Sequence, residues 1–189
     1  TVGKPLPGVE VAIAADGEIL LRGPNVFRGY YRNDAATEEI LTEDGWLRTG
    51  DLGALSDDGF LSITGRKKDL IITSSGKNIT PVNIENLLRE SRYVTEAVVF
   101  GDRRPYLVAV LTLDHEESLK LAQRLGIRDE PETIAADPRV HAEIQREIDE
   151  VNRRLARIEQ IKRFAILGRE LTQDNGELTP TLKVKRAVV

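Results

Sequence analysis

Four consecutive charged residues, Arg66 to Asp69, constrain the fold of this 189-residue chain more than any other feature. They follow Gly65 and separate a stretch rich in short strand and turn signals from one in which strand and helix signals alternate. A run of four charges cannot form part of a hydrophobic core. We therefore predict a solvated connector at 65–69, a candidate hinge between a first part at 1–64 and a second at 70–189.

The first part has the pattern of a small β-rich subdomain. Short apolar runs alternate with glycine-containing turns, and Asp16-Gly17 is a strong hairpin signal. One helix is expected at Ala35 to Leu41, with Asp34 as its cap. We expect the strands to form a distorted barrel.

The second part alternates strands and helices. Thr80-Pro81, Asp114 with Glu117, and Asp137-Pro138 have the pattern of helix starts. The expected buried strands are Val94 to Phe100, Leu107 to Leu113 and Ile161 to Leu167. The last helix has one apolar stripe, formed by Val140, Ile144, Ile148, Val151, Leu155 and Ile158. The predicted fold class is therefore α+β, with a β-rich subdomain followed by a hinge-linked α/β lid that has a central sheet and flanking helices.

Composition excludes several classes of function. A net charge of −4 argues against general nucleic-acid binding, which needs a basic surface. The chain has no cysteine and only two histidines, His115 and His141, so zinc-thiolate and histidine-rich metal sites are excluded. No apolar run reaches membrane-spanning length, and we expect a reducing, cytoplasmic compartment. Because the chain lacks methionine and opens with Thr1, we also expect it to be a piece of a longer protein.

Three segments have residues that could carry chemistry. Asp51 follows Thr49-Gly50, and a carboxylate after such a turn could accept bonds from both hydroxyls of a ribose. It could equally satisfy local backbone amides. Arg66 and Lys68 are two residues apart, and in an extended linker they would point to the same side. Gly76 lies in a tight turn where the missing side chain would permit close approach of a ligand. Composition alone does not distinguish these readings from a plain linker and β-turn.

The third segment is the polar tail that contains Lys183. A lysine near a C-terminus is usually a solvated charge. On a short segment that begins with a proline, Lys183 could instead bridge a carboxylate and a phosphate as negative charge develops in a transition state.

Taken together and in this order, the three segments resemble the C-terminal part of the adenylate-forming superfamily, which includes acyl-CoA synthetases, nonribosomal adenylation domains and luciferases. The resemblance rests on GEILLRGPNVFRGYYRNDAATEEILTEDGWLRTGDLG at 17–53, GRKKDLIITSSGKNITPVNIE at 65–85 and LTPTLKVKR at 178–186. The second and third motifs are more similar to long-chain fatty acyl-CoA ligases. Many members have Ser-Gly before the tail lysine, whereas Thr181-Leu182 stands here, and Lys185 is a nearby competitor for the role.

The resemblance implies a two-step reaction with ATP, Mg²⁺ and coenzyme A. A fatty acid and ATP give an acyl-adenylate, and the CoA thiol then displaces AMP. By this resemblance Asp51 holds the ATP ribose, Arg66 contacts the same nucleotide, and Lys183 serves adenylation. Lys68 is the hinge, and Gly76 lines the pantetheine path. No metal-ligating residue is expected in this chain.

The superfamily's phosphate-binding loop and its aromatic-Gly-x-Thr-Glu segment do not occur in these residues. We therefore expect the chain to be inactive alone, to work with an N-terminal catalytic body of the same protein, and to expose apolar surface at 1–64 that favours self-association. A peripheral membrane association stays open. So do two other functions, an acyl-AMP ligase or adenylation unit that loads a carrier protein, and a non-catalytic module that binds nucleotide or protein.

Overall fold

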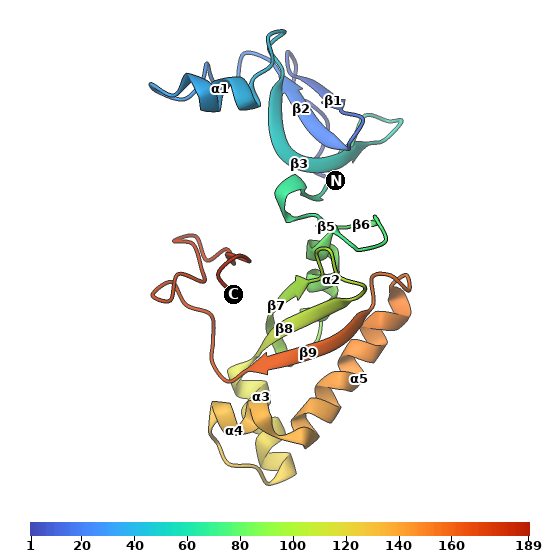
Figure 1. Ribbon diagram of the computed structural model, residues 1–189, viewed down its shortest axis with the longest axis vertical. Coiled ribbons are helices and arrows are strands. Elements are labelled where there is room, and N and C mark those ends of the chain that lie inside the picture. The colour runs from blue at the N-terminus through green and yellow to red at the C-terminus, as the bar shows by residue number, and fades with distance from the viewer. The chain divides into compact units, whose positions relative to one another are not determined.

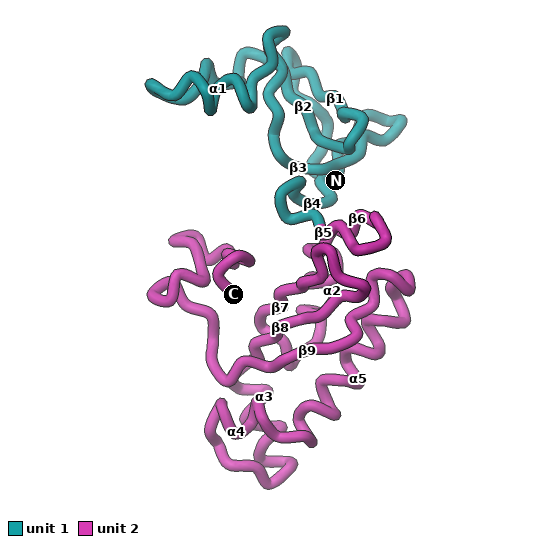
Figure 2. The backbone as a smooth tube through the Cα atoms, in the orientation of Figure 1, with its two compact units in different colours: residues 1–70 teal, residues 71–189 magenta.

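The computed structural model describes residues 1–189, and the chain divides into two compact units, Thr1–Leu70 and Ile71–Val189 (Figure 2). Each unit has a sheet of its own. The mixture of helices and antiparallel and parallel strands confirms the predicted α+β class.

The first unit is built on a four-stranded antiparallel sheet in chain order. Its strands are β1 (Glu10–Ile13), β2 (Glu18–Arg22), β3 (Leu47–Leu55) and β4 (Leu61–Arg66), and β4 leads into a short 3₁₀ turn, η1 (Lys67–Asp69). The predicted turn at Asp16-Gly17 joins β1 to β2. The long strand β3 curls through the sheet (Figure 1), and Val2 and Gly3 pair with Leu61 of β4. The expected distorted barrel is thus an open, curled sheet that the N-terminal segment partly closes.

The one helix of this unit, α1 (Asp34–Ile40), begins one residue before the predicted start. Asn33 caps the helix, because its side-chain oxygen accepts a hydrogen bond from the amide of Ala36. The prediction that Asp34 is the cap is therefore wrong. Asp34 lies in the first turn, where its negative charge is favourable to the helix dipole.

Few apolar side chains of the first unit are buried. Only Ile19 and Leu52 lie in its interior, whereas the large exposed apolar residues are Val2, Leu6, Phe27, Tyr30, Tyr31, Leu55, Phe60 and Ile63. The helix α1 buries no residue at all. The exposed apolar surface agrees with the expectation for 1–64, and self-association stays a prediction.

The second unit contains a hairpin, a three-stranded sheet and four helices. The elements are β5 (Ile71–Ile72), β6 (Asn78–Ile79), α2 (Pro81–Leu88), β7 (Val94–Phe100), β8 (Leu107–Leu113), α3 (His115–Leu125), α4 (Pro131–Ala136), α5 (Pro138–Arg154) and β9 (Ile161–Leu167). The sheet order is β7-β8-β9. The β7–β8 pair is antiparallel, and β9 lies parallel to β8 because the helices α3, α4 and α5 form a crossover between them.

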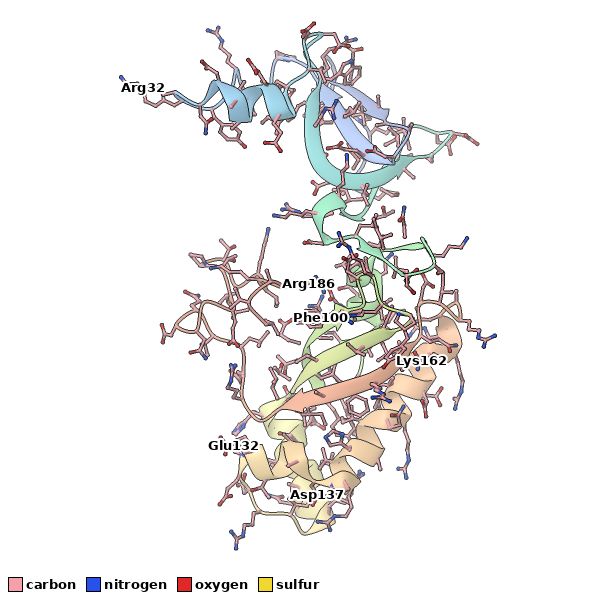
Figure 3. All side chains as sticks on the ribbon, viewed as in Figure 1. Arg32, Phe100, Glu132, Asp137, Lys162 and Arg186 are labelled. Carbon is pink, nitrogen blue, oxygen red and sulfur yellow. The ribbon has the colours of Figure 1, made fainter.

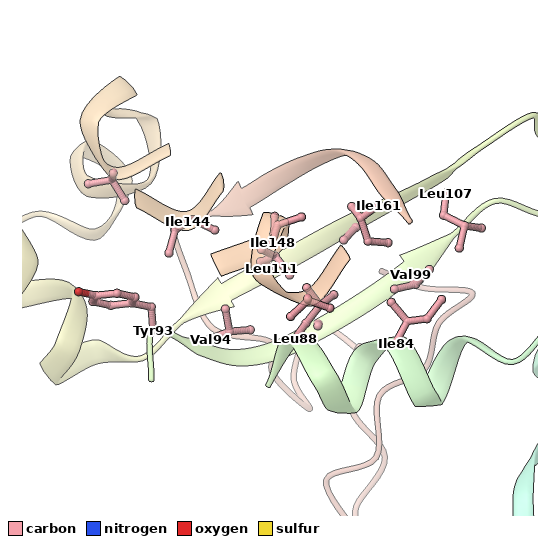
Figure 4. Packing of buried hydrophobic residues seen from close by; sticks show 14 of the residues in the cluster. Ile84, Leu88, Tyr93, Val94, Val99, Leu107, Leu111, Ile144, Ile148 and Ile161 are labelled. Atoms are coloured by element: carbon pink, nitrogen blue, oxygen red, sulfur yellow. The ribbon is translucent and has the colours of Figure 1, made fainter. Parts of the chain in front are cut away.

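The helices α2 and α5 contribute to one hydrophobic core with the sheet. Ile84 and Leu88 of α2 and Ile144 and Ile148 of α5 meet apolar residues of the three strands (Figure 4). All four side chains are almost fully buried. Ile144 and Ile148, together with Val140 and Val151, confirm most of the predicted stripe of α5.

Two local predictions for this unit need correction, and one helix was not expected. The α5 stripe stops early, because the helix ends before Leu155, which still packs against the core, and Ile158 is 47% exposed. Asp114 caps α3 by accepting from the amide of Glu117, but the Glu117 side chain pairs with Lys120 and does not return to the cap. The six-residue helix α4 was not predicted, since so short a segment shows no apolar period.

No helix of the chain combines the length and the apolar character that crossing a membrane requires.

Candidate functional site

Asp51 lies in the middle of β3, at a bulge. Between the pairs Leu20–Arg48 and Glu18–Leu52, one residue of β2 faces three residues of β3, Thr49 to Asp51. Gly50 has a φ of +71°, which favours glycine. Thr49 and Gly50, which were predicted to form a turn at a strand end, therefore belong to a bulge within a strand. Such bulges bend the strand and are frequent beside active sites, where they redirect a side chain.

Side chains replace the strand hydrogen bonds that the bulge interrupts. The Thr49 hydroxyl donates to the carbonyl of Ile19 (2.7 Å) and accepts from the amide of Asp51 (3.1 Å). The amide of Gly50 donates to the Glu18 carboxylate (2.9 Å). The bulge that presents Asp51 is thus fixed on both sides.

Arg66 is the cross-strand partner of Asp51. Its Nε lies 3.2 Å from Oδ1 of Asp51, an ion-pair contact that leaves Oδ2 without a partner. The Asp51 side chain is 28% exposed. This arrangement leaves one anionic acceptor beside a guanidinium, which suits a ligand with hydroxyl donors and a nearby phosphate.

A hollow of about 350 Å³ lies next to this pair. It is lined by Thr49, Gly50, Arg66, Lys67 and Lys68. Arg66 and Lys68 do not share an extended linker as predicted, because Arg66 ends β4 and Lys68 lies in the η1 turn. They nevertheless line the same hollow. Arg66 is paired with Asp51, and Lys67 is paired with Asp16 and Glu18, so Lys68 is the cation of the hollow that is free to meet an anionic ligand.

Lys67, between them, is held by two carboxylates of the first unit. Its Nζ lies 2.7 Å from Asp16 and 2.9 Å from Glu18. The hydrogen bond to Asp16, followed by the one to Glu18, raises the pKa of Lys67, and the same contact with Lys67 lowers the pKa of Asp16. Lys67 therefore stays charged and attached to the sheet.

Glu18 was missed by the sequence analysis. Its side chain is only 6% exposed, and it joins the Gly50 amide of the bulge to the Lys67 ammonium of η1. A single acid after a hairpin glycine gives no local signal of this role, because both partners are distant in sequence.

Gly76 lies in the turn of the β5–β6 hairpin. Its amide donates to the carbonyl of Thr73 (2.9 Å), its φ is +75°, and a Cβ at this position would meet nothing within 4 Å. The space beside Gly76 is therefore open. The hairpin is fastened to the turn after β7 by a bond from the Ser74 amide to the carbonyl of Arg104 (3.1 Å).

Lys183 lies in a turn of the tail that follows β9. Its carbonyl accepts from the amide of Thr179 (2.8 Å), and its own amide donates to the Thr179 hydroxyl (3.0 Å). Leu182 has a φ of 58°. The ammonium groups of Lys183 and Lys185 are both exposed and make no ion pair, so geometry alone does not choose between them.

A buried carboxylate shapes this turn from within. Glu177 accepts two bonds from Arg169 (2.8 and 2.6 Å) and one from the amide of Thr172 (3.1 Å). The contact with Arg169 lowers the pKa of Glu177 to about 2, so the group is ionised at neutral pH.

The predicted site residues therefore fall into two sets. Asp51, Arg66 and Lys68 lie together in the first unit, and Gly76 and Lys183 belong to the second. No group of three or more His, Asp or Glu side chains in the chain could hold a metal ion.

A family model described as the AMP-binding enzyme C-terminal domain matches residues 68–189. The chain belongs to this family. Over its whole length the chain is 48% identical to the long-chain-fatty-acid–CoA ligase FadD15 of Mycobacterium tuberculosis, and over 99% of its length 38% identical to the long-chain-fatty-acid–CoA ligase ACSBG1 of Rattus norvegicus. It covers 32% and 29% of these proteins, so it spans about a third of the length of the relatives it matches.

Solved structures of adenylate-forming enzymes show the same fold. The o-succinylbenzoate coenzyme A synthetase of Bacillus subtilis in complex with AMP matches 98% of the chain, and the match covers 34% of that enzyme, with a TM-score of 0.70 and 31% identity. The same enzyme has been solved with ATP and a magnesium ion, and there the TM-score is 0.69.

Proposed function

We propose that this chain is the C-terminal part of an ATP-dependent fatty acid–CoA ligase. The observation that carries the proposal is the 48% identity to a long-chain-fatty-acid–CoA ligase over the entire chain, including all three motifs. Since the chain spans about a third of such a protein, an N-terminal catalytic body of the same protein supplies the acyl pocket and most contacts to ATP.

In the first step, a carboxylate oxygen of the fatty acid attacks the α-phosphorus of ATP, and pyrophosphate leaves. Asp51 accepts hydrogen bonds from the ribose hydroxyls through its unpaired oxygen, and Arg66 adds a positive charge beside the nucleotide. Lys183 contacts the carboxylate and the α-phosphate, where negative charge gathers in the transition state. Mg²⁺ would balance phosphate charge in such enzymes. This chain has no cluster of side chains that could bind the ion, so the residues named here act without binding a metal themselves.

In the second step, the thiolate of CoA attacks the acyl carbon, and AMP leaves with the electron pair of the broken C–O bond. The proposed role of Gly76 is to let the pantetheine arm pass, because the space where its side chain would stand is open. Lys183 and the thiol cannot both approach one side of the carbonyl. Rotation of the 70–189 lid at Lys68 exchanges the two segments between the half-reactions.

The test measures the two half-reactions separately in the full-length enzyme. ATP–pyrophosphate exchange with palmitate reports adenylation, and palmitoyl-CoA formation from supplied palmitoyl-adenylate reports the thioester step. Lys183→Ala should lower exchange by about 10²-fold or more, as losing one group that stabilises transition-state charge does. It should leave the thioester step near the wild-type rate.

Lys185→Ala is the matched control and should retain exchange. If Lys185→Ala abolishes exchange and Lys183→Ala does not, the assignment of the lysine is wrong. If acyl-adenylate forms but only a carrier protein accepts the acyl group, the ligase proposal fails in favour of a carrier-loading unit.

A further inference from the structure

The tail that carries Lys183 has no helix and no strand of its own. Residues 170–189 are shaped by bonds among themselves, including the one from the Lys185 amide to the carbonyl of Glu177 (2.7 Å). Such bonds fix the form of a turn. They do not fix where the turn stands against the rest of the unit.

Two side chains make the hydrogen bonds between residues 170–189 and the rest of the unit. Arg169, which follows β9, bonds to Glu170 and Glu177 close by in sequence. Arg186 alone reaches the helix α2 and the sheet. Arg186 donates to both oxygens of Glu85 (2.6 and 3.1 Å), and its Nη1 also donates to the carbonyl of Val99 (2.6 Å). Figure 3 shows Arg186 beside Phe100, at the end of β7. The attachment of the tail to α2 and β7 therefore depends on a residue three positions after Lys183.

The partner of Arg186 is itself rigidly held. Glu85 lies on α2 with a side chain 8% exposed, and its Oε1 accepts a bond from the amide of Val99 (2.7 Å). Because β7 is an edge strand of the sheet, Val99 has outward-facing backbone groups without a neighbouring strand. Glu85 accepts from the Val99 amide, and Arg186 donates to the Val99 carbonyl. The two side chains thus make the hydrogen bonds that a neighbouring strand would make.

The environment makes this contact a strong constraint. The Nε of Arg186 is buried without a partner, and the side chain as a whole is 25% exposed. A two-pronged Arg–carboxylate contact fixes orientation as well as distance, which a single ammonium contact does not. Removing Arg186 leaves the buried Glu85 carboxylate without a counter-charge.

We propose that the Glu85–Arg186 pair is a positioning device that sets the place of the Lys183 ammonium for adenylation. The proposal rests on the function proposed for Lys183. Neither Glu85 nor Arg186 touches substrate; both act through the tail. Since α2 begins two residues after β6, the pair also fastens the Lys183 turn to the helix that follows the Gly76 hairpin, so both segments move with one rigid element.

The experiment uses the full-length enzyme with Arg186→Gln, Glu85→Gln and the double variant that removes both charges. Each should lower the kcat of adenylate formation by about 10²-fold, because a displacement of about 1 Å at a reacting group has an effect of that size. The KM values for ATP and palmitate, and the rate of thioester formation from supplied palmitoyl-adenylate, should stay near wild-type. Arg186→Lys, which keeps the charge without the fork, should give an intermediate rate.

Arg154→Gln is the control, since it breaks an exposed Arg–carboxylate contact with Glu90 in the same unit. It should leave both half-reactions unchanged. Limited trypsin digestion gives a readout independent of activity, and cleavage after Lys183 and Lys185 should be faster in Arg186→Gln than in Arg154→Gln.

The possible results separate this proposal from the function on which it rests. If Lys183→Ala impairs adenylation and the Arg186 and Glu85 variants do not, the positioning role is refuted and the proposed function stands. If those variants slow both half-reactions equally, the pair only stabilises the domain, and the proposal is also refuted. If Lys183→Ala has no effect, both proposals fail.

Discussion

The Glu18 side chain connects the β3 bulge to the η1 turn. It is buried under the β3 bulge and accepts bonds from the Gly50 amide and the Lys67 ammonium. A glutamine at this place can still accept from Gly50, but its NH₂ group cannot pair with an ammonium. We therefore expect Glu18→Gln to lower the free energy of unfolding by about 1.5–3 kcal/mol, the range for hydrogen bonds to charged groups.

The same substitution should raise the KM for ATP in the full-length enzyme, because the bulge that presents Asp51 loses its support. Glu10→Gln is the control, since Glu10 forms an exposed cross-strand pair with Arg22, and such pairs contribute about 1 kcal/mol or less. Thermal unfolding of the 189-residue chain and ATP kinetics check both points. Equal losses of stability in the two variants, with an unchanged KM, would contradict the role of Glu18.

At this scale the sequence proposes roles for some residues and gives no role to others. Asp51, Arg66, Lys68, Gly76 and Lys183 stand in contiguous motifs that resemble a known family. Glu18, Glu85 and Arg186 lie in the same motifs, but they act through partners far along the chain, and Arg186 stands 101 positions after Glu85. Local patterns contain no information on which distant charges will meet when the chain folds.

At the scale of elements, the regular hydrophobic periods of helices and strands were predicted correctly, whereas the places where these periods are interrupted were not. The stripe of α5 and the apolar runs of β7, β8 and β9 appear in the structure at their expected places. The stripe was extended one residue too far, because Ile158 continues the helical spacing after the backbone has become extended at Leu155. The bulge at Thr49 to Asp51 has no periodic signal either, since it depends on the pairing of β2 with β3.

Two isoleucines of equal size test this difference in burial. Ile144 of α5 has no exposed surface, whereas Ile158 is 47% exposed. Ile144→Ala should lower the free energy of unfolding by about 2–5 kcal/mol through lost burial and the cavity it leaves. Ile158→Ala should stay within about 0.5 kcal/mol of the wild type. Chemical denaturation of the two variants checks the prediction, and similar losses for both would place Ile158 in the core after all.

At the scale of the whole molecule, the proposed roles are divided between two units. The residues proposed to hold the nucleotide lie before Leu70, and those proposed to act in the alternating steps, Gly76 and Lys183, lie after it. The link between the units includes η1, whose turn is closed by one hydrogen bond of 3.3 Å from the Leu70 amide to the carbonyl of Lys67. Asp16 and Glu18 hold Lys67 to the first sheet, whereas Lys68 has no ion pair. Lys68 is thus the first residue of the link whose side chain makes no ion pair that would hold the backbone to the first sheet.

This arrangement makes Lys68→Pro the informative substitution for the proposed hinge. Proline fixes φ near −65° and restricts the residue before it, so rotation at this point is blocked whichever arrangement of the units the enzyme then keeps. The overall rate of palmitoyl-CoA formation from palmitate should fall by about tenfold or more, since an enzyme that cannot rearrange completes only one half-reaction well. Pyrophosphate exchange and thioester formation from supplied palmitoyl-adenylate, measured separately, should show one of the two near its wild-type rate. Lys68→Ala removes the same charge and leaves the backbone free, so it should retain the overall rate. If alanine is as harmful as proline, the charge of Lys68 in the cationic hollow matters and its backbone does not, and the hinge must lie at another residue.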